Sequence, residues 1–207
     1  MILCVENLYC FRGSFAILSK VSFELDYGQI ISLHGTNGSG KTTLLKTLAQ
    51  VIPTEKGKIT NNSVGTCFLG HENCLKSDLT VSENLQFWTG IYNQTSMDEE
   101  ISTLNLKNIL DIPTRQLSAG QKRKVSLARL LISKSNLWLL DEPETSLDNN
   151  NRNLLRALLM KHLEKRGSII LATHSPIDME NVLPIDITQF KLPVNVSTNQ
   201  YIDSDNE

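Results

Sequence analysis

Residues 35–42 read GTNGSGKT, a run of glycines followed by lysine and threonine at a spacing that suits the phosphate groups of a nucleotide. Glycines allow consecutive backbone N–H groups to turn toward one anion, and a helix that starts after the loop directs its positive end at the same place. Lys41 would then reach the β- and γ-phosphates, and Thr42 would offer its hydroxyl to a Mg²⁺ ion. The sequence therefore predicts a site for ATP and Mg²⁺ that is formed by Gly35, Thr36, Asn37, Gly38, Ser39, Gly40, Lys41, Thr42 and Thr43.

Acidic residues follow a second apolar stretch, LWLLDEP at 137–143. The apolar residues predict a buried strand that delivers Asp141 and Glu142 to its carboxyl end, which is where open α/β sheets bind their ligands. Asp141 would help to hold Mg²⁺, and Glu142 would act as a general base toward the attacking water. A further strand, SIILATH at 168–174, ends in His174, which would contact the γ-phosphate and hold that water in line.

The stretch QLSAGQKRKVSLARLL begins at Gln116 with small and polar residues and continues as a basic helix. Ser118 and Gln121 have the spacing of a capping box, so they predict a capped helix start, and a helix start is also a site for an anion. Because residues 35–42 already hold this chain's own nucleotide, these donors would serve the nucleotide of a second copy. We therefore expect a two-fold homodimer, arranged head to tail, in which each ATP is completed from the opposite chain by Ser118, Ala119, Gly120 and Gln121.

The periodicity of apolar residues predicts an α/β domain in which these motifs lie between strands and helices. Apolar or alternating stretches predict strands at 21–25, 29–34, 64–70, 137–142 and 168–174. Residues 41–52 have helical spacing until Pro53, and residues 151–167 carry leucines on one helical face before Gly167. From about residue 80 helix-like patterns replace the strand signals, including stretches at 80–92 and 97–111. We therefore expect a mainly helical sub-lobe at about 78–135.

The composition suits one domain that spans residues 1–207 and ends in a polar tail at about 194–207. With 20 basic and 22 acidic side chains the formal net charge is -2, so we expect no nucleic-acid partner. The short basic run Lys122, Arg123, Lys124 is interpreted as a solvated helix face. No run of about eighteen apolar residues occurs, so any membrane role would be that of a peripheral subunit.

Five motifs occur in the order that is typical of ABC-type ATPases, and they resemble that family over nearly the whole chain: GTNGSGKT at 35–42, LSAGQ at 117–121, LLDEP at 139–143, SLD at 146–148 and TH at 173–174. The resemblance implies a P-loop NTPase fold of the ABC ATPase type, ATP hydrolysis, and contact of Asp148 with the partner subunit. Further stretches, FLGHENCLKSDLTVSENL and THSP, resemble the ATP-binding subunits of cytochrome c biogenesis transporters.

That narrower resemblance implies an integral membrane subunit of a cytochrome c biogenesis transporter as partner. It also implies that ATP hydrolysis drives haem export, or haem release from a carrier, and both directions stay open. The ATPase would then be a peripheral protein on the cytoplasmic face of the bacterial inner membrane. A cleft near residues 71–85 would pass its motion to the membrane partner.

Three positions depart from the usual family pattern. Ala119 stands where glycine is commoner, and His71 stands where the family usually has a Mg²⁺-sensing glutamine. The aromatic residue that stacks on adenine is replaced at the matching position by Arg12, with Phe11 beside it. A guanidinium can also stack on a purine, so Arg12 is a candidate for the adenine contact, whereas Phe11 is equally consistent with the core.

Other functions fit the sequence less well. An ABC transporter for a different substrate would carry the same motifs. A soluble ABC-type ATPase that acts on DNA would need a long coiled coil between Lys41 and Ser118, where no sustained heptads occur. A small-molecule kinase with a P-loop would leave the stretch at 117–121 and His174 unexplained.

Overall fold

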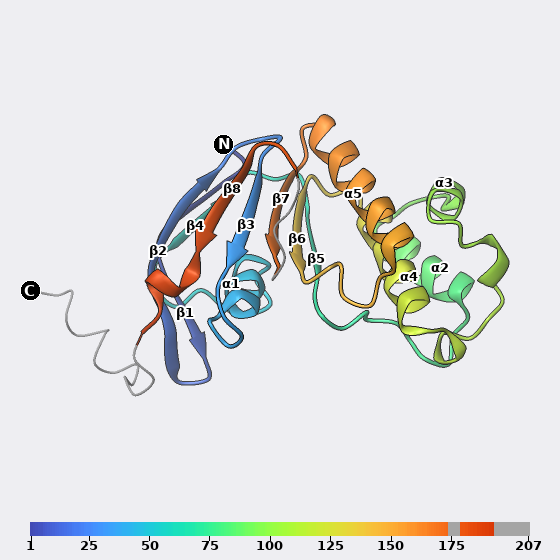
Figure 1. Ribbon diagram of the computed structural model, residues 1–207, viewed down its shortest axis with the longest axis horizontal. Coiled ribbons are helices and arrows are strands. Elements are labelled where there is room, and N and C mark those ends of the chain that lie inside the picture. The colour runs from blue at the N-terminus through green and yellow to red at the C-terminus, as the bar shows by residue number, and fades with distance from the viewer. Residues whose placement is uncertain (174–178, 193–207) are drawn as a thin grey trace, which may run out of the picture.

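Two β-sheets form the body of the protein, one antiparallel and one parallel (Figure 1). The computed structural model describes residues 1–173 and 179–192. The antiparallel sheet has the strand order β2–β1–β4, and the parallel sheet has the order β5–β6–β7–β3–β8. Their strands are β1 (Leu3–Arg12), β2 (Phe15–Leu25), β3 (Ile30–His34), β4 (Lys58–Asn61), β5 (Thr66–Leu69), β6 (Leu137–Asp141), β7 (Ser168–Ala172) and β8 (Val182–Asp186).

Helices lie on both faces of the parallel sheet and extend to one side of it (Figure 1). Helix α1 (Lys41–Leu48) lies between the two sheets and packs against both. Helix α5 (Asn149–Glu164) covers the opposite face of the parallel sheet, and α4 (Ala119–Ile132), α2 (Val81–Ile91) and α3 (Asp98–Thr103) lie beyond it on the right of Figure 1. Short 3₁₀ helices connect these elements: η1 (Lys107–Ile109), η2 (Thr114–Gln116) and η3 (Ile187–Phe190).

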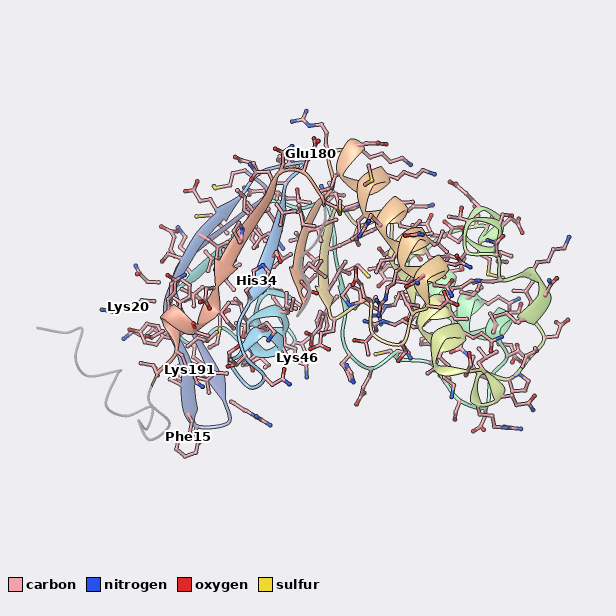
Figure 2. All side chains as sticks on the ribbon, in the orientation of Figure 1. Phe15, Lys20, His34, Lys46, Glu180 and Lys191 are labelled. Atoms are coloured by element: carbon pink, nitrogen blue, oxygen red, sulfur yellow. The ribbon has the colours of Figure 1, made fainter. Side chains whose placement is uncertain are left out.

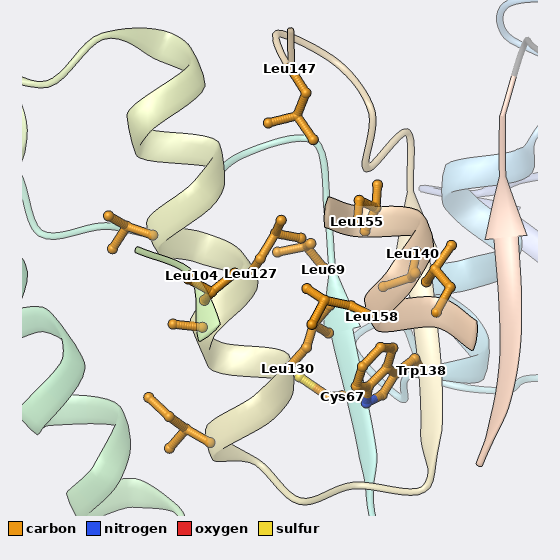
Figure 3. Packing of buried hydrophobic residues seen from close by; sticks show 14 of the residues in the cluster. Cys67, Leu69, Leu104, Leu127, Leu130, Trp138, Leu140, Leu147, Leu155 and Leu158 are labelled. Carbon is orange, nitrogen blue, oxygen red and sulfur yellow. The ribbon is translucent and has the colours of Figure 1, made fainter. Parts of the chain in front are cut away.

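The inner strands of the parallel sheet, β6, β7 and β3, are buried on both faces, and alternate residues of these strands enter different cores. On β6, Leu137 and Leu139 belong to the core that contains α1, whereas Trp138 and Leu140 belong to the core that contains α4 and α5. Figure 3 shows Trp138 and Leu140 beside the leucines of α5. Burial on both faces explains why these inner strands are mostly apolar along their length, as is usual in parallel sheets.

The expected α/β class is confirmed, because helices cover both faces of a parallel sheet, and most expected elements are present. The helix predicted at 41–52 ends earlier, at Leu48, because Gln50 takes a left-handed backbone conformation with φ 58°. The helix predicted at 97–111 is also wrong in length. Only α3 forms there, since Asn105 has φ 49° and interrupts the helical path before η1 begins.

Sequence periodicity did not indicate the strands β1, β4 and β8. Strand β1 mixes buried residues with exposed Glu6 and Asn7, and its pairing with β2 shifts register three times, so its apolar residues do not alternate. Strand β8 lies at the edge of the parallel sheet and exposes 42% of Leu183. Such strands form because the neighbouring strand offers hydrogen bonds, and this long-range contact leaves little trace in a local pattern.

The segment 78–135 contains α2, α3, η1, η2 and α4, in line with the expected helical character. Its division from the rest of the chain as a separate sub-lobe stays a prediction. The polar tail expected at 194–207 lies outside the described residues.

Candidate active site

The loop between β3 and α1 folds around its own lysine. The ammonium of Lys41 donates hydrogen bonds to the carbonyl oxygens of Gly35 at 2.7 Å and Thr36 at 3.2 Å, and the side chain is almost fully buried. Gly35 is held at φ 148°, and a Cβ atom there would come within 2.7 Å of Ser39 Oγ. The loop therefore requires glycine at this position, because any side chain would disrupt the tight turn.

The start of α1 offers hydrogen-bond donors to an anion. Gly40 is the N-cap residue, with φ 108°, and no side chain among the described residues caps the helix. Ser39 Oγ is buried and also lacks a hydrogen-bond partner within that part of the chain. Uncapped N–H groups, an unpartnered hydroxyl and a nearby ammonium are the features of a phosphate site. Thr36, Asn37 and Gly38 lie exposed in the same loop, and Thr43 follows in the first turn of α1.

Thr42 and Asp141 meet across the two motifs. The hydroxyl of Thr42 donates a hydrogen bond of 2.7 Å to Asp141 Oδ2, although the residues are 99 positions apart. Asp141 is the last residue of β6, and its side chain is buried. A hydroxyl and a carboxylate oxygen at this distance are ligands of the hard type that Mg²⁺ prefers.

Glu142 has a strained backbone. It follows β6 directly and has φ 48°, a conformation that costs an ordinary residue about 1 kcal/mol or more. Its N–H donates to the carbonyl of Ala172 at 2.9 Å, which continues the pairing of β6 with β7. Its Oε2 accepts a hydrogen bond of 3.3 Å from the hydroxyl of Thr145. The carboxylate therefore stands at the carboxyl edge of the sheet, beside Asp141.

His174, the other residue expected to be catalytic, lies outside the described residues. Strand β7 ends at Ala172, between β3 and β6 in the sheet. The carboxyl ends of β3, β7 and β6 therefore lie side by side, and the role of His174 stays a prediction.

The helix start at 118–121 has the expected capping box. Ser118 Oγ accepts a hydrogen bond from the N–H of Gln121 at 3.2 Å, and Gln121 Oε1 accepts one from the N–H of Ser118 at 2.9 Å. Ser118, Ala119 and Gln121 are exposed, whereas Gly120 is partly buried. Gly120 packs closely against the backbone of Ser146, since a Cβ atom on Gly120 would lie 3.0 Å from the carbonyl oxygen of Ser146. This helix start therefore presents its side chains to the outside of the chain.

Asp148 and His71 lie near this helix start. Asp148 is the N-cap residue of α5, and its Oδ1 accepts a hydrogen bond of 2.8 Å from the N–H of Asn151. His71 is exposed and lines a cavity of about 180 Å³ with Ala119, Arg123 and Ser146, among others. Thr42 and Asp141 are not among the residues that line this cavity, and a Mg²⁺ role of His71 stays a prediction.

The side chains of Arg12 and Phe11 lie in different environments. Phe11 is buried in a small core with Tyr9 and Ala16, so the core interpretation of Phe11 is correct. Arg12 is exposed near the tip of the β1–β2 hairpin, where it pairs with Phe15. Figure 2 shows Phe15 at that tip, and 55% of its side chain is exposed. The adenine contact of Arg12 stays a prediction.

Arg123 is a residue whose environment the sequence analysis predicted incorrectly. The basic run 122–124 predicts a solvated face, yet Arg123 is 2% exposed and donates hydrogen bonds to the carbonyl oxygens of both Asp141 and Glu142. The periodic pattern held a signal for this burial, because Arg123 is spaced at i, i+4 and i+7 with buried Leu127 and Leu130. Three adjacent basic residues are typical of a solvated face, and they hide this helical spacing.

Comparisons with known proteins agree with this geometry. The family model described as ABC transporter matches residues 18–145. The cytochrome c biogenesis ATP-binding export protein CcmA of Cereibacter sphaeroides is 38% identical over 198 residues, which cover 96% of this chain and 94% of that protein. The CcmA protein of Paracoccus denitrificans is 38% identical over 190 residues, with coverages of 92% and 90%.

A solved structure of the ATP-binding subunit of an ABC transporter has a TM-score of 0.77 at 23% identity, and covers 84% of this chain and 80% of that chain. At this identity the likeness concerns the fold. Family and fold together imply use of ATP, dimerisation and a membrane partner in general terms. The chain therefore belongs to the ABC transporter family, as an ATP-hydrolysing subunit related to the cytochrome c biogenesis ATP-binding export proteins.

Proposed function

We propose that the chain binds MgATP on the loop 35–42 and hydrolyses it with Glu142 as the general base. Backbone N–H groups of the loop and the ammonium of Lys41 hold the phosphates, and Thr42 and Asp141 hold Mg²⁺. When bound, Mg²⁺ neutralises negative charge on the phosphate oxygens. Glu142 takes a proton from the attacking water, and His174 keeps that water in line.

One observation carries this proposal, the hydrogen bond of 2.7 Å between Thr42 and Asp141. It joins the phosphate loop to the end of β6, which Glu142 follows directly, so the two motifs lie side by side. Among the described residues, no three His, Cys, Asp or Glu side chains gather as ligands for a metal. A Mg²⁺ ion at Thr42 and Asp141 would therefore take its other ligands from phosphate and water, as is usual for this ion.

Each nucleotide is shared between two chains of a homodimer. Ser118 and Gln121 form an exposed helix start, and exposure is what a contact with a second chain requires. Asp148, at the start of α5, contacts the opposite chain in the same interface. A head-to-tail pair has two-fold symmetry, so both nucleotides are enclosed by one interface.

The partner of this dimer is an integral membrane subunit of a cytochrome c biogenesis transporter. Relatives that are 38% identical over more than nine-tenths of the chain carry that process in their names. Within residues 1–173 and 179–192, no helix combines the length and the apolar composition of a membrane-spanning segment. We assign the chain to the cytoplasmic face of the bacterial inner membrane, where it couples ATP hydrolysis to haem export or to haem release from a carrier.

Co-purification of the chain with its membrane subunit tests this assignment. We expect the detergent-solubilised complex to contain haem, visible by its absorption spectrum, and its haem content to change when ATP is hydrolysed. A Lys41→Ala chain in the same complex is the control, because it should retain the haem when ATP is added. A complex without haem, whose ATPase activity responds to another substrate, would overturn the haem assignment and leave the ATPase assignment intact.

A further inference from the structure

Arg123 joins three separate segments of the chain through a single buried guanidinium. It lies in the second turn of α4, five residues after Ser118, and is 2% exposed. Its Nε donates to the carbonyl of Pro143 at 3.1 Å. Its Nη2 donates to the carbonyls of Asp141 at 3.1 Å and Glu142 at 2.9 Å.

The remaining nitrogen, Nη1, contacts the loop that follows β5. It donates to the carbonyl of Gly70 at 2.8 Å and to Asn73 Oδ1 at 3.4 Å. An arginine has five N–H donors, and these contacts give each of them an acceptor. A buried guanidinium that is satisfied so completely holds its acceptors in one arrangement, because any movement would leave a buried donor unpaired.

Three of these acceptors are consecutive carbonyl groups, those of residues 141–143. Three consecutive carbonyl groups can converge on one guanidinium only if the chain turns sharply, and Glu142 provides this turn with its φ of 48°. The N–H of Glu142 is held by Ala172 of β7, and its carbonyl is held by Arg123. The backbone on both sides of the Glu142 side chain is therefore fixed, which determines the direction in which the carboxylate leaves the main chain.

We propose that Arg123 is a positioning residue for hydrolysis, which holds the backbone of Glu142 in its own chain so that the carboxylate faces the nucleotide. The inference rests on the proposed role of Glu142 as general base. Arg123 acts through the carbonyl groups and not through the nucleotide itself. Its loss therefore slows the chemical step and leaves ATP binding on residues 35–42 intact.

The substitution Arg123→Lys tests this role because it keeps the charge and removes the planar fork of donors. A lysine has its donors on one nitrogen, so it cannot span Gly70 and residues 141–143 together. We expect kcat to fall about 10- to 100-fold, as misplacement of a reacting group does, with KM for ATP within about threefold of the parent. If the lysine variant fails to fold, Arg123→Gln, which removes the buried charge, replaces it in every arm of the experiment.

Arg129→Lys is the matched control for a purely structural effect. Arg129 lies on the same helix, and its Nη2 donates to the carbonyl of Phe68 on β5 rather than to the carbonyls of residues 141–143. We expect this variant to lower the midpoint of thermal unfolding without a selective loss of kcat. If the Arg123 and Arg129 variants lost kcat by similar factors and showed similar changes in KM, Arg123 would be a structural residue and the inference would be wrong.

Mixed dimers of full-length chains, purified through two different tags, decide whether Arg123 acts within its own chain. In the first dimer one chain carries Glu142→Gln and the other carries Arg123→Lys, so the remaining Glu142 sits beside the altered residue. In the second dimer one chain carries both substitutions and the other is the parent, so the remaining Glu142 keeps its arginine. Both dimers hold the same two substitutions, and we expect the first to hydrolyse ATP at least about tenfold more slowly.

The outcomes separate this inference from the proposed function. Equal rates in the two dimers, or a slower second dimer, would overturn the positioning role of Arg123 while leaving Glu142 as the base. Full activity of the Glu142→Gln homodimer would remove the general-base role, and the inference would fall with it.

Discussion

The indole ring of Trp138 stacks on the imidazole ring of His162, with ring centroids 3.7 Å apart and planes inclined by 12°. Trp138 lies on β6 and His162 near the end of α5, so the stack attaches the helix to the sheet. Gly167 makes room for it, since a Cβ atom there would come within 2.3 Å of His162 Nε2. Burial lowers the pKa of His162 to about 4, against weaker opposing contributions from backbone groups of Ser168 and Asn136.

This low pKa predicts a loss of stability in acid. An unfolded histidine has a pKa of about 6.5, so between that value and about 4 the unfolded chain binds a proton that the folded chain does not. Stability contributed by the neutral imidazole is therefore complete above about pH 6.5 and declines as the pH falls through this window, by on the order of 3 kcal/mol at most. Urea unfolding at several pH values measures the decline.

The variant His162→Phe keeps an aromatic ring on Trp138 and removes the titrating group. We expect its free energy of unfolding to vary less with pH between 6.5 and 4 than that of the parent. The same pH dependence in both proteins would show that other groups cause it.

The pair Thr42 and Asp141 predicts the metal dependence of the ATPase. Asp141→Asn keeps the shape of the side chain and removes its charge, so Mg²⁺ should bind more weakly and hydrolysis should fall by about 100-fold at ordinary Mg²⁺ concentrations. Turnover measured against Mg²⁺ concentration checks this, with partial recovery expected at high Mg²⁺. Glu144→Gln makes the same change of charge three positions later and should behave as the parent. An unchanged Mg²⁺ curve for Asp141→Asn would exclude Asp141 as a ligand.

Glu142→Gln should separate ATP binding from hydrolysis. The amide cannot accept a proton as the carboxylate does, so we expect kcat to fall by at least about 100-fold while ATP still binds. Because the bound nucleotide is not consumed, the variant should accumulate as a dimer with ATP, which size-exclusion chromatography detects. Normal turnover by this variant would remove Glu142 from its role.

Sharing of each nucleotide between two chains predicts a specific result when two inactive variants are mixed. Lys41→Ala damages the phosphate loop, and Ser118→Arg obstructs the exposed helix start. In a mixed dimer both substitutions fall in one site and the other site is intact, so an equal mixture should recover about a quarter of the parental activity. If each chain hydrolysed ATP alone, Ser118→Arg would be active by itself and mixing would add nothing.

The phosphate loop and the acidic pair could be predicted from the sequence because their chemistry is local. GTNGSGKT places its glycines, lysine and threonine within one short loop and the helix start that follows it, and LWLLDEP carries its carboxylates at the end of one apolar run. Both patterns depend on neighbours along the chain. The capping box of Ser118 and Gln121 is local in the same sense, and the structure has it as expected.

Contacts between distant segments were decided only by the tertiary structure. Thr42 reaches Asp141 because β3 and β6 flank β7 in the parallel sheet, an order that no local spacing encodes. Arg123 is buried because residues 70 and 141–143, far from it in sequence, converge on one guanidinium. Local composition determines which groups are available for chemistry, whereas the packing of strands and helices determines which of those groups meet, because hydrogen bonding and burial join residues regardless of their separation along the chain.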